Sequence, residues 1–430
     1  MTAVNHPLAA QTGEALEQVA DLRDIATPAP ERRRLADPSA AAALMKTELL
    51  ERLQAVFQAQ AGDPVVLLSG GVDSIAVAAA AVALGVRPHA VTVSAAGGTD
   101  TANAAAAAAG LGLTHEVIDI DEQDVVTLAR EAMARLRLSE LWEVTYAIPL
   151  IAAADALDQR ANVGPILTGS AADAILAGGK TVSHPLGSPE AVDELDQIIR
   201  KESANNFRYD RLVPDFQARV IPTYETRFIH VFQTMRFWEI AETFAPPALF
   251  GERKGEPVDK LCLRIACEQL LPESIKSLAW AKKSPIQRSA GIMGTLAAGA
   301  RRAAAALPGA QTYTDPMTES FEAVATRLFL ALLQHEPRPS RALRLKQTGD
   351  PQVTEFVVHY RRPEDPTELK DDWNERRLGY WLDAARGRGL TPTVVEVFDT
   401  HHVIGAVEVD GQQYEIGHVG RRMELQARPR

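Results

Sequence analysis

VVLLSGGVDS, residues 65–74, places two glycines and a carboxylate where a buried strand passes into a helix. Residues 65–68 are all aliphatic, and two of them are β-branched, a composition typical of a strand that is buried on both faces of a parallel sheet. Gly70 and Gly71 follow, and after them comes a long alanine-rich stretch with strong helix propensity. Backbone N–H groups that no Cβ hinders, at the positive end of a helix, bind anions. Residues 69–74 therefore predict a phosphate-binding loop.

The carboxylate of this loop, Asp73, indicates which anion to expect. A carboxylate repels a polyphosphate unless a divalent cation lies between them, so we expect a magnesium nucleotide rather than bare phosphate. The two glycines alone would fit an ordinary tight turn that Ser69 caps, and the aspartate favours the nucleotide. The residues expected to contact the nucleotide are Ser69, Gly70, Gly71, Val72, Asp73 and Ser74.

Composition excludes several classes of function. The chain has 430 residues, which allows two or three domains, and its formal net charge of -11 argues against a general nucleic-acid binder. Its two cysteines, Cys262 and Cys267, lie in an apolar stretch with helical spacing and are expected in the core rather than in a disulfide or a metal site. The sequence contains neither a long apolar run nor a signal-peptide pattern, so we expect a cytoplasmic protein without a membrane partner.

Strands and helices alternate along the middle of the chain, which predicts an α/β fold with a doubly wound parallel sheet. A mainly helical extension follows, and a small α+β appendage with a hairpin turn at Asp410-Gly411 ends the chain. The predicted domains are an N-terminal extension with one amphipathic helix (1–60), the α/β domain (61–345) and the appendage (350–430).

SGGVDS (69–74) resembles the pyrophosphate-binding loop, or PP-loop, of the ATP pyrophosphatase family, which includes GMP, NAD and asparagine synthetases and several tRNA-thiolating enzymes. From about residue 62 to 295 the chain resembles the synthetase half of asparagine synthetase and β-lactam synthetase. Matching segments are AVTVSAAGGTDTANAAAAAAGLGLTHEVIDI (90–120), ILTGSAADAILAGG (166–179), YETRFIHVF (224–232) with DKLCLRIACEQLLPESI (259–275), and KSPIQRSAG (283–291). The implied fold is that of the adenine nucleotide alpha-hydrolases.

The resemblance implies roles for residues on the nucleotide side of the site. Ser94 is expected beside adenine, and Gly169 belongs to the segment that meets the nucleotide. Asp173 stands where the family has a second magnesium ligand, so Asp73 and Asp173 would hold Mg²⁺ together with phosphate oxygens. Alternatively, Asp173 only caps the helix that begins at Ala174.

The resemblance also implies catalytic residues. Lys283 stands eight positions before Gly291, which is the family spacing for the catalytic lysine, although its neighbour Lys282 is an alternative. Glu225, alone or through Tyr224, would accept the proton of the attacking amine. The alternative for Glu225 is an ion pair with Arg227.

The chain also departs from the family at several positions. Ser170 stands where asparagine synthetase has a glutamate and β-lactam synthetase a tyrosine, Ala171 replaces a glycine, and FIHVF lacks the usual Pro-Phe-Leu-Asp. We therefore expect an altered substrate pocket. Thr2 follows Met1 in place of the nucleophilic cysteine of a glutaminase, and only residues 1–60 precede the domain. The nitrogen would then come from an amine substrate, free ammonia or another subunit.

These inferences predict an ATP-dependent, amide-forming synthetase with ATP and Mg²⁺ as cofactors. It would adenylate a small or carrier-linked carboxylate, one of specialised metabolism, and transfer the acyl group to an amine. A PP-loop sulfurtransferase is one alternative and would need a reactive cysteine. The other is a binding protein with a retired active site, for which Ser170 and Ala171 are the only signs. The appendage would pack on the synthetase domain, form a homodimer, or dock a partner protein that delivers or carries the substrate.

Overall fold

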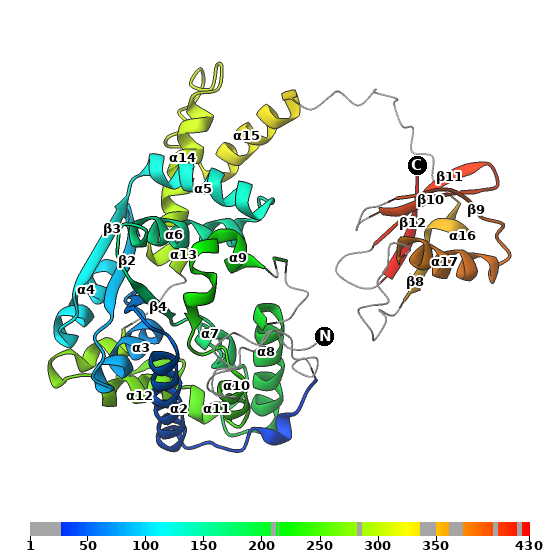
Figure 1. Cartoon of the computed structure of the whole chain (residues 1–430). Coiled ribbons are helices and arrows are strands. Elements are labelled where there is room, and N and C mark those ends of the chain that lie inside the picture. The colour runs from blue at the N-terminus through cyan, green and yellow to red at the C-terminus, as the bar shows by residue number, and fades with distance from the viewer. Residues whose placement is uncertain are drawn as a thin grey trace. The chain divides into compact units, whose positions relative to one another are not determined.

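The computed structural model describes residues 27–207, 212–213, 215–281, 286–335, 350–360, 373–398, 403–418 and 424–430. Contacts divide the chain into two units, Met1–Leu333 and Gln334–Arg430, and each is described by itself (Figure 1). The domain boundary predicted after residue 345 falls outside the described residues and stays a prediction. In the described ranges, no helix combines the length and the apolar composition needed to cross a membrane.

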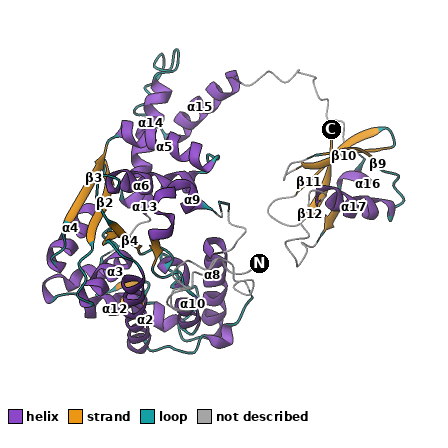
Figure 2. Cartoon of the chain, in the orientation of Figure 1, coloured by secondary structure: helices purple, strands orange, loops and turns teal. Residues whose placement is uncertain are grey.

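The first unit is built on a five-stranded sheet in the order β3-β2-β1-β4-β5, and every neighbouring pair is parallel. Helices lie on both sides of the strands (Figure 2). The predicted α/β fold with a doubly wound parallel sheet is therefore confirmed. The chain reverses its direction of travel across the sheet between β1 and β4, where such sheets bind ligands beyond the carboxyl ends of the strands. The strands are β1 Asp63–Leu67, β2 His89–Ala95, β3 His115–Ile120, β4 Val163–Thr168 and β5 Phe228–His230.

Two hydrophobic cores fill the space between the sheet and its helices. The larger core includes the inner face of α2, with Met45, Leu49 and Leu53 buried, so this helix belongs to the packed unit rather than standing apart. The helices on this side are α2 Pro38–Ala59, α3 Val72–Ala83, α4 Asp100–Leu111, α12 Leu261–Leu270 and the 3-10 helix η5 Glu273–Trp280. Those on the other side are α5 Glu122–Leu136, α6 Leu141–Leu157, α9 Phe216–Val220 and α14 Ile292–Ala305.

The remaining elements are the following. Near the beginning of the first unit lies η3 Pro30–Arg32. After β4 follow α7 Ala172–Ile175, α8 Pro189–Phe207, η4 Pro222–Arg227, α10 Met235–Glu242, α11 Pro246–Leu249, β6 Gly251–Arg253, β7 Glu256–Val258, α13 Ile286–Ser289 and α15 Phe321–His335.

The second unit is a five-stranded antiparallel sheet in the order β8-β12-β11-β10-β9, with helix α17 packed on it. Trp381 of α17 and Tyr414 of β11 are fully buried in its core. Asp410 and Gly411 both have positive φ, of 50° and 78°, which suits the two-residue hairpin turn predicted there. Its elements are α16 Pro351–Thr354, β8 Val357–His359, α17 Trp373–Arg386, β9 Thr393–Val397, β10 Val403–Val409, β11 Gln412–His418 and β12 Glu424–Pro429.

Candidate functional site

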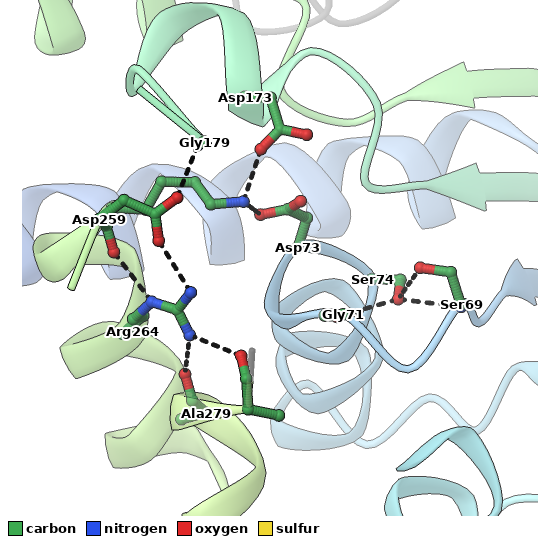
Figure 3. Close-up of polar contacts among 11 residues, drawn as sticks. Ser69, Gly71, Asp73, Ser74, Asp173, Gly179, Asp259, Arg264 and Ala279 are labelled. Atoms are coloured by element: carbon green, nitrogen blue, oxygen red, sulfur yellow. Dashed lines mark hydrogen bonds and ion pairs between the residues drawn. The ribbon is translucent and has the colours of Figure 1, made fainter. Parts of the chain in front are cut away.

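The Ser-Gly-Gly loop connects β1 to α3 at the carboxyl end of β1. Gly70 has φ 72°, and a Cβ there would lie 2.6 Å from the carbonyl oxygen of Asp100, so glycine is required on two grounds. Ser74 ties the loop together, because its Oγ accepts a hydrogen bond from the Ser69 N–H at 3.1 Å and donates to the Gly71 carbonyl at 3.1 Å (Figure 3). The loop is therefore held in a fixed shape by its own residues.

The loop ends at the amino terminus of α3, where anions bind. Gly71 is the N-cap residue, and no side chain in the described part of the chain caps this end. The first turn of a helix directs N–H groups without an intrahelical partner beyond the helix end, which is the geometry of an anion site. Gly169, directly after β4, packs against the same helix end, since a Cβ there would lie 2.7 Å from both Asp73 Cβ and Ser74 N. The ends of β1 and β4 thus meet at the place predicted for phosphates.

The end of β2 forms the next part of this edge. Ser94 lies near the end of the strand, and its Oγ accepts a hydrogen bond from Thr101 Oγ1 at 3.1 Å. Gly291 follows α13 and has φ 82°, and a Cβ there would lie 2.7 Å from the carbonyl oxygen of Ala95. Residues 289–291 therefore lie at the predicted adenine side, where the Ala95 N–H also donates to the Ala290 carbonyl at 2.7 Å. Lys283 and its alternative Lys282 lie outside the described residues, so the catalytic lysine stays a prediction.

Asp73 and Asp173 both contact the ammonium of Lys260. Lys260 Nζ lies 2.7 Å from Asp73 Oδ1 and 2.7 Å from Asp173 Oδ1 (Figure 3). The side chains of Lys260 and Asp73 are 1 % and 3 % exposed, whereas that of Asp173 is 53 % exposed. Two carboxylates that share one cation fit the predicted role of these residues as ligands of Mg²⁺. Among the described residues, no group of three or more His, Cys, Asp or Glu side chains could hold a metal without a nucleotide.

The backbone of Lys260 and the contacts of its neighbour Asp259 fix the position of Lys260. Lys260 itself has a left-handed backbone, with φ 50°, directly before α12. Its neighbour Asp259 accepts hydrogen bonds from the Gly179 N–H at 2.6 Å and from Arg264 Nη2 at 2.9 Å (Figure 3). Burial would raise the pKa of Asp259, but these two hydrogen bonds and the charges of Lys260 and Arg264 outweigh it, so the pKa is lowered. Asp259 is therefore a stable anionic anchor.

A cavity of about 560 Å³ opens beside Asp173 and Lys260. Its volume lies in the range of small-molecule sites. The wall includes the β6–β7 hairpin and Trp280, over whose ring the Arg253 guanidinium carbon lies at 3.6 Å from the centroid. The cationic residues lining it are Arg253, Lys254, Lys260 and Arg264, and the acidic ones are Asp173, Glu256 and Asp259. The cavity thus carries charges of both signs and adjoins the two aspartates.

The structure does not bring Tyr224 and Glu225 to this edge. Both lie in η4, which ends directly before β5, and therefore at the amino end of the parallel sheet. The Tyr224 hydroxyl donates to Asp158 Oδ1 at 2.8 Å, and Asp158 follows α6 shortly before β4 begins. Burial first, and then this hydrogen bond, raise the pKa of Tyr224 to about 12. Glu225 is exposed. Neither residue is therefore placed to act on a substrate at the nucleotide loop.

Two residues at the carboxyl edge carry no role predicted from the sequence. One is Lys260, whose only sequence signal is its place in the DKLCLR segment. The other is Tyr146 of α6, whose hydroxyl lies 3.1 Å from Ser170 Oγ. Tyr146 lies in a mainly apolar helix that also contains Glu143, Thr145 and Asp155, so its presence there is no signal of a site. Both contacts are tertiary, which is why residue spacing does not reveal them.

The cysteines are unsuited to sulfur transfer. Cys262 and Cys267 are both fully buried in α12. Burial raises the pKa of the Cys262 thiol to about 12 and also raises the pKa of Cys267. A thiol with a raised pKa forms little nucleophilic thiolate. The arrangement of these two residues therefore gives no support to the sulfurtransferase alternative.

Comparison with known proteins identifies the domain. Residues 48–234 match the family model described as asparagine synthase, and this part of the chain is a domain of that family. No curated protein matches the chain. Among solved structures, the chain is similar to NMN synthetase from Francisella tularensis, with 18% identity, a TM-score of 0.25, and coverage of 38% of this chain and 71% of that one. It is also similar to NAD+ synthetase from Burkholderia pseudomallei, with 19% identity, a TM-score of 0.23, and coverage of 45% and 88%.

Proposed function

Because residues 48–234 form an asparagine synthase domain, we propose that this protein is an ATP-dependent synthetase that joins a carboxylate to an amine. The single observation that carries the proposal is the meeting of three groups at one sheet edge. These are the uncapped amino terminus of α3, the Asp73 and Asp173 carboxylates, and the close-packed Gly169. N–H groups bind phosphate, and carboxylates bind the cation that accompanies it. This combination suits a nucleoside triphosphate.

In the first proposed step, an oxygen of the substrate carboxylate attacks the α-phosphorus of ATP. The bond between the α-phosphorus and the bridging oxygen breaks, and pyrophosphate leaves with the electron pair. The loop N–H groups and the amino end of α3 stabilise the negative charge on the phosphates. Asp73 and Asp173 would hold Mg²⁺, which neutralises and orients the phosphate oxygens when bound. Lys283, the predicted catalytic lysine, would add a positive charge to this step.

In the second step, a neutral amine attacks the acyl carbon of the adenylate. The C–N bond forms, the C–O bond to AMP breaks with its electrons going to AMP, and one proton passes to solvent. The Tyr146 hydroxyl lies 3.1 Å from the Oγ of Ser170, the residue after Gly169, and these two hydroxyl groups would orient the amine. Orientation of two reactants removes part of the entropic barrier. The acid and the amine belong to specialised metabolism in this proposal, since Ser170 and Ala171 alter the pocket.

Exchange of labelled pyrophosphate into ATP tests the proposal. The purified chain is incubated with Mg²⁺, ATP, labelled pyrophosphate and a panel of amino acids and aliphatic carboxylic acids. At least one acid should support exchange, and Asp73→Asn should reduce that exchange by about 10²-fold or more. Asp63→Asn is the matched control, because Asp63 is exposed at the amino end of β1. No exchange with any acid, or near-normal exchange in Asp73→Asn, would refute the proposal.

A further inference from the structure

The buried ammonium of Lys260 stands where a metal ion would lie between Asp73 and Asp173. We propose that Lys260 is a built-in counter-ion that keeps free divalent cations out of this site. Under this proposal, the two aspartates accept a divalent ion only when it arrives bound to the phosphates of a nucleotide. The inference rests on the proposed function for the nucleotide site and adds an order of binding to it.

The contacts of Lys260 are those of a strong, shared ion pair. Both Nζ–Oδ1 distances, to Asp73 and to Asp173, are 2.7 Å, which is the length of a charge-assisted hydrogen bond. The ammonium is almost completely removed from water, and so is the Asp73 carboxylate. A buried charge is tolerated when it is paired and hydrogen-bonded, and here the ammonium is hydrogen-bonded to two carboxylates. A bare divalent ion would have to bind these carboxylates beside the ammonium or displace it.

The fold keeps Lys260 at this position. The left-handed backbone of Lys260 aims its side chain at the sheet edge, while Asp259 is bound to the chain after α7 through the Gly179 N–H and to α12 through Arg264. Arg264 also donates to the Asp259 carbonyl at 2.8 Å. On the other side of the pair, Gly178 packs so closely against Asp173 that a Cβ would overlap its carboxylate. The surrounding contacts therefore fix the position of the ammonium between the two carboxylates.

A nucleotide changes this balance because it carries its own negative charge. The triphosphate offers the ammonium a new anionic partner, so that the two carboxylates can turn to the cation that the phosphates carry. A free metal ion brings only positive charge and is repelled by Lys260 at close range. The proposal therefore predicts weak binding of the free metal ion and stronger binding of the nucleotide-bound metal ion. A purely structural ion pair would not predict this difference in affinity.

Binding of Mn²⁺ without nucleotide tests the proposal, because free Mn²⁺ is measured directly by electron paramagnetic resonance. Lys260→Met in the full chain should bind Mn²⁺ about tenfold more tightly than the wild type or better, since the competing charge is gone. Mn²⁺ should also raise the melting temperature of Lys260→Met and leave that of the wild type unchanged. The matched control is Lys254→Met, which removes an exposed lysine from the wall of the same cavity and should behave as the wild type.

Further variants guard against misfolding and against a secondary site. Lys260→Arg keeps the charge and should keep the weak Mn²⁺ binding, and adding Asp73→Asn to Lys260→Met should abolish the new binding. Tight Mn²⁺ binding by the wild type overturns the proposal, and this measurement needs no variant. Equal Mn²⁺ binding by the wild type and Lys260→Met overturns it as well. The proposed function fails separately, through absent pyrophosphate exchange, because the Mn²⁺ measurement uses neither ATP nor an acid.

Discussion

Gly169→Ala adds a single methyl group at the point where β4 touches the nucleotide loop. The new Cβ would lie 2.7 Å from Asp73 Cβ and 2.7 Å from Ser74 N, both of which belong to the first turn of α3. Carbon atoms in favourable contact are about 3.5–4.0 Å apart, so the strand end and the helix must separate by about 1 Å. Overpacking of this kind costs about 1–3 kcal/mol of stability. A displacement of about 1 Å at a reacting centre costs about 10²-fold in rate.

We therefore expect Gly169→Ala to melt about 2–10 °C below the wild type and to bind Mg-ATP at least about tenfold more weakly. Differential scanning calorimetry and isothermal titration calorimetry measure the two effects. Gly187→Ala is the matched control, since nothing lies within 4 Å of the methyl group that it adds. If Gly169→Ala melts and binds ATP as the wild type does, the tight approach of β4 to α3 does not position the site and the reasoning is wrong.

Four further changes probe the strain, the buried charge and the chemistry of the chain. Ala171→Gly should stabilise the fold by about 1 kcal/mol in thermal melts, because φ 77° disfavours a side chain, and an unchanged melt would contradict this. Burial raises the pKa of Glu48 from 4.5 to about 7, so between these pH values the folded chain keeps a proton that the unfolded chain loses. The free energy of unfolding should therefore fall by at most about 3 kcal/mol as the pH rises from 4.5 to 7. Thermal melts across this pH range should show a smaller fall for Glu48→Gln. Iodoacetamide should leave native Cys262 and Cys267 unlabelled and the activity intact, whereas rapid inactivation would revive the sulfurtransferase alternative. Lys283→Ala should lower kcat by orders of magnitude with ATP affinity retained, as titration calorimetry would show; an equal loss of both would point to ground-state binding.

The fold is predictable because its signals are local. An aliphatic run, two glycines and an alanine-rich helix within residues 65–84 describe one strand, one turn and one helix, and each follows from the backbone preferences of those residues. Repetition of the pattern then fixes a parallel sheet, and a parallel sheet gathers the residues after its strands at one edge. The order of strands and helices along the chain is therefore enough to bring Asp73, Ser94 and Gly169 to the same edge.

The order of strands and helices does not place Tyr224 and Glu225, because a residue can be assigned to an edge of the sheet only when the start of the neighbouring strand is known. Their predicted role rests on the spacing of a motif, and the motif does not say whether its glutamate precedes or follows the strand. In the structure, β5 starts at Phe228, immediately after η4, so the motif lies at the amino end of the strand. A shift of a few residues in the strand boundary moves a side chain from one edge of the sheet to the other.

Lys260 illustrates a second limit, which is distance along the chain. Its pairing with Asp73 joins residues 187 positions apart, and no periodicity or turn signal spans that interval. Burial of a lysine also runs against composition-based expectation, since lysine is almost never fully buried unless it is paired. Only the fold, which brings the start of α12 against the start of α3, makes the pair available.

At residue 170 the sequence indicates the loss of a phenol from the site, whereas the structure shows a phenol from another element beside this residue. Ser170 replaces the tyrosine that β-lactam synthetase has at this position, which suggests a pocket stripped of its phenol. Yet the Tyr146 hydroxyl, from a helix 24 residues earlier, lies 3.1 Å from Ser170 Oγ. The Tyr146 phenol therefore reaches the position at which β-lactam synthetase carries its own tyrosine. The phenol at this strand end comes from helix α6 rather than from the loop, and under the proposed function β4 and α6, rather than η4, would form the amine side of the site.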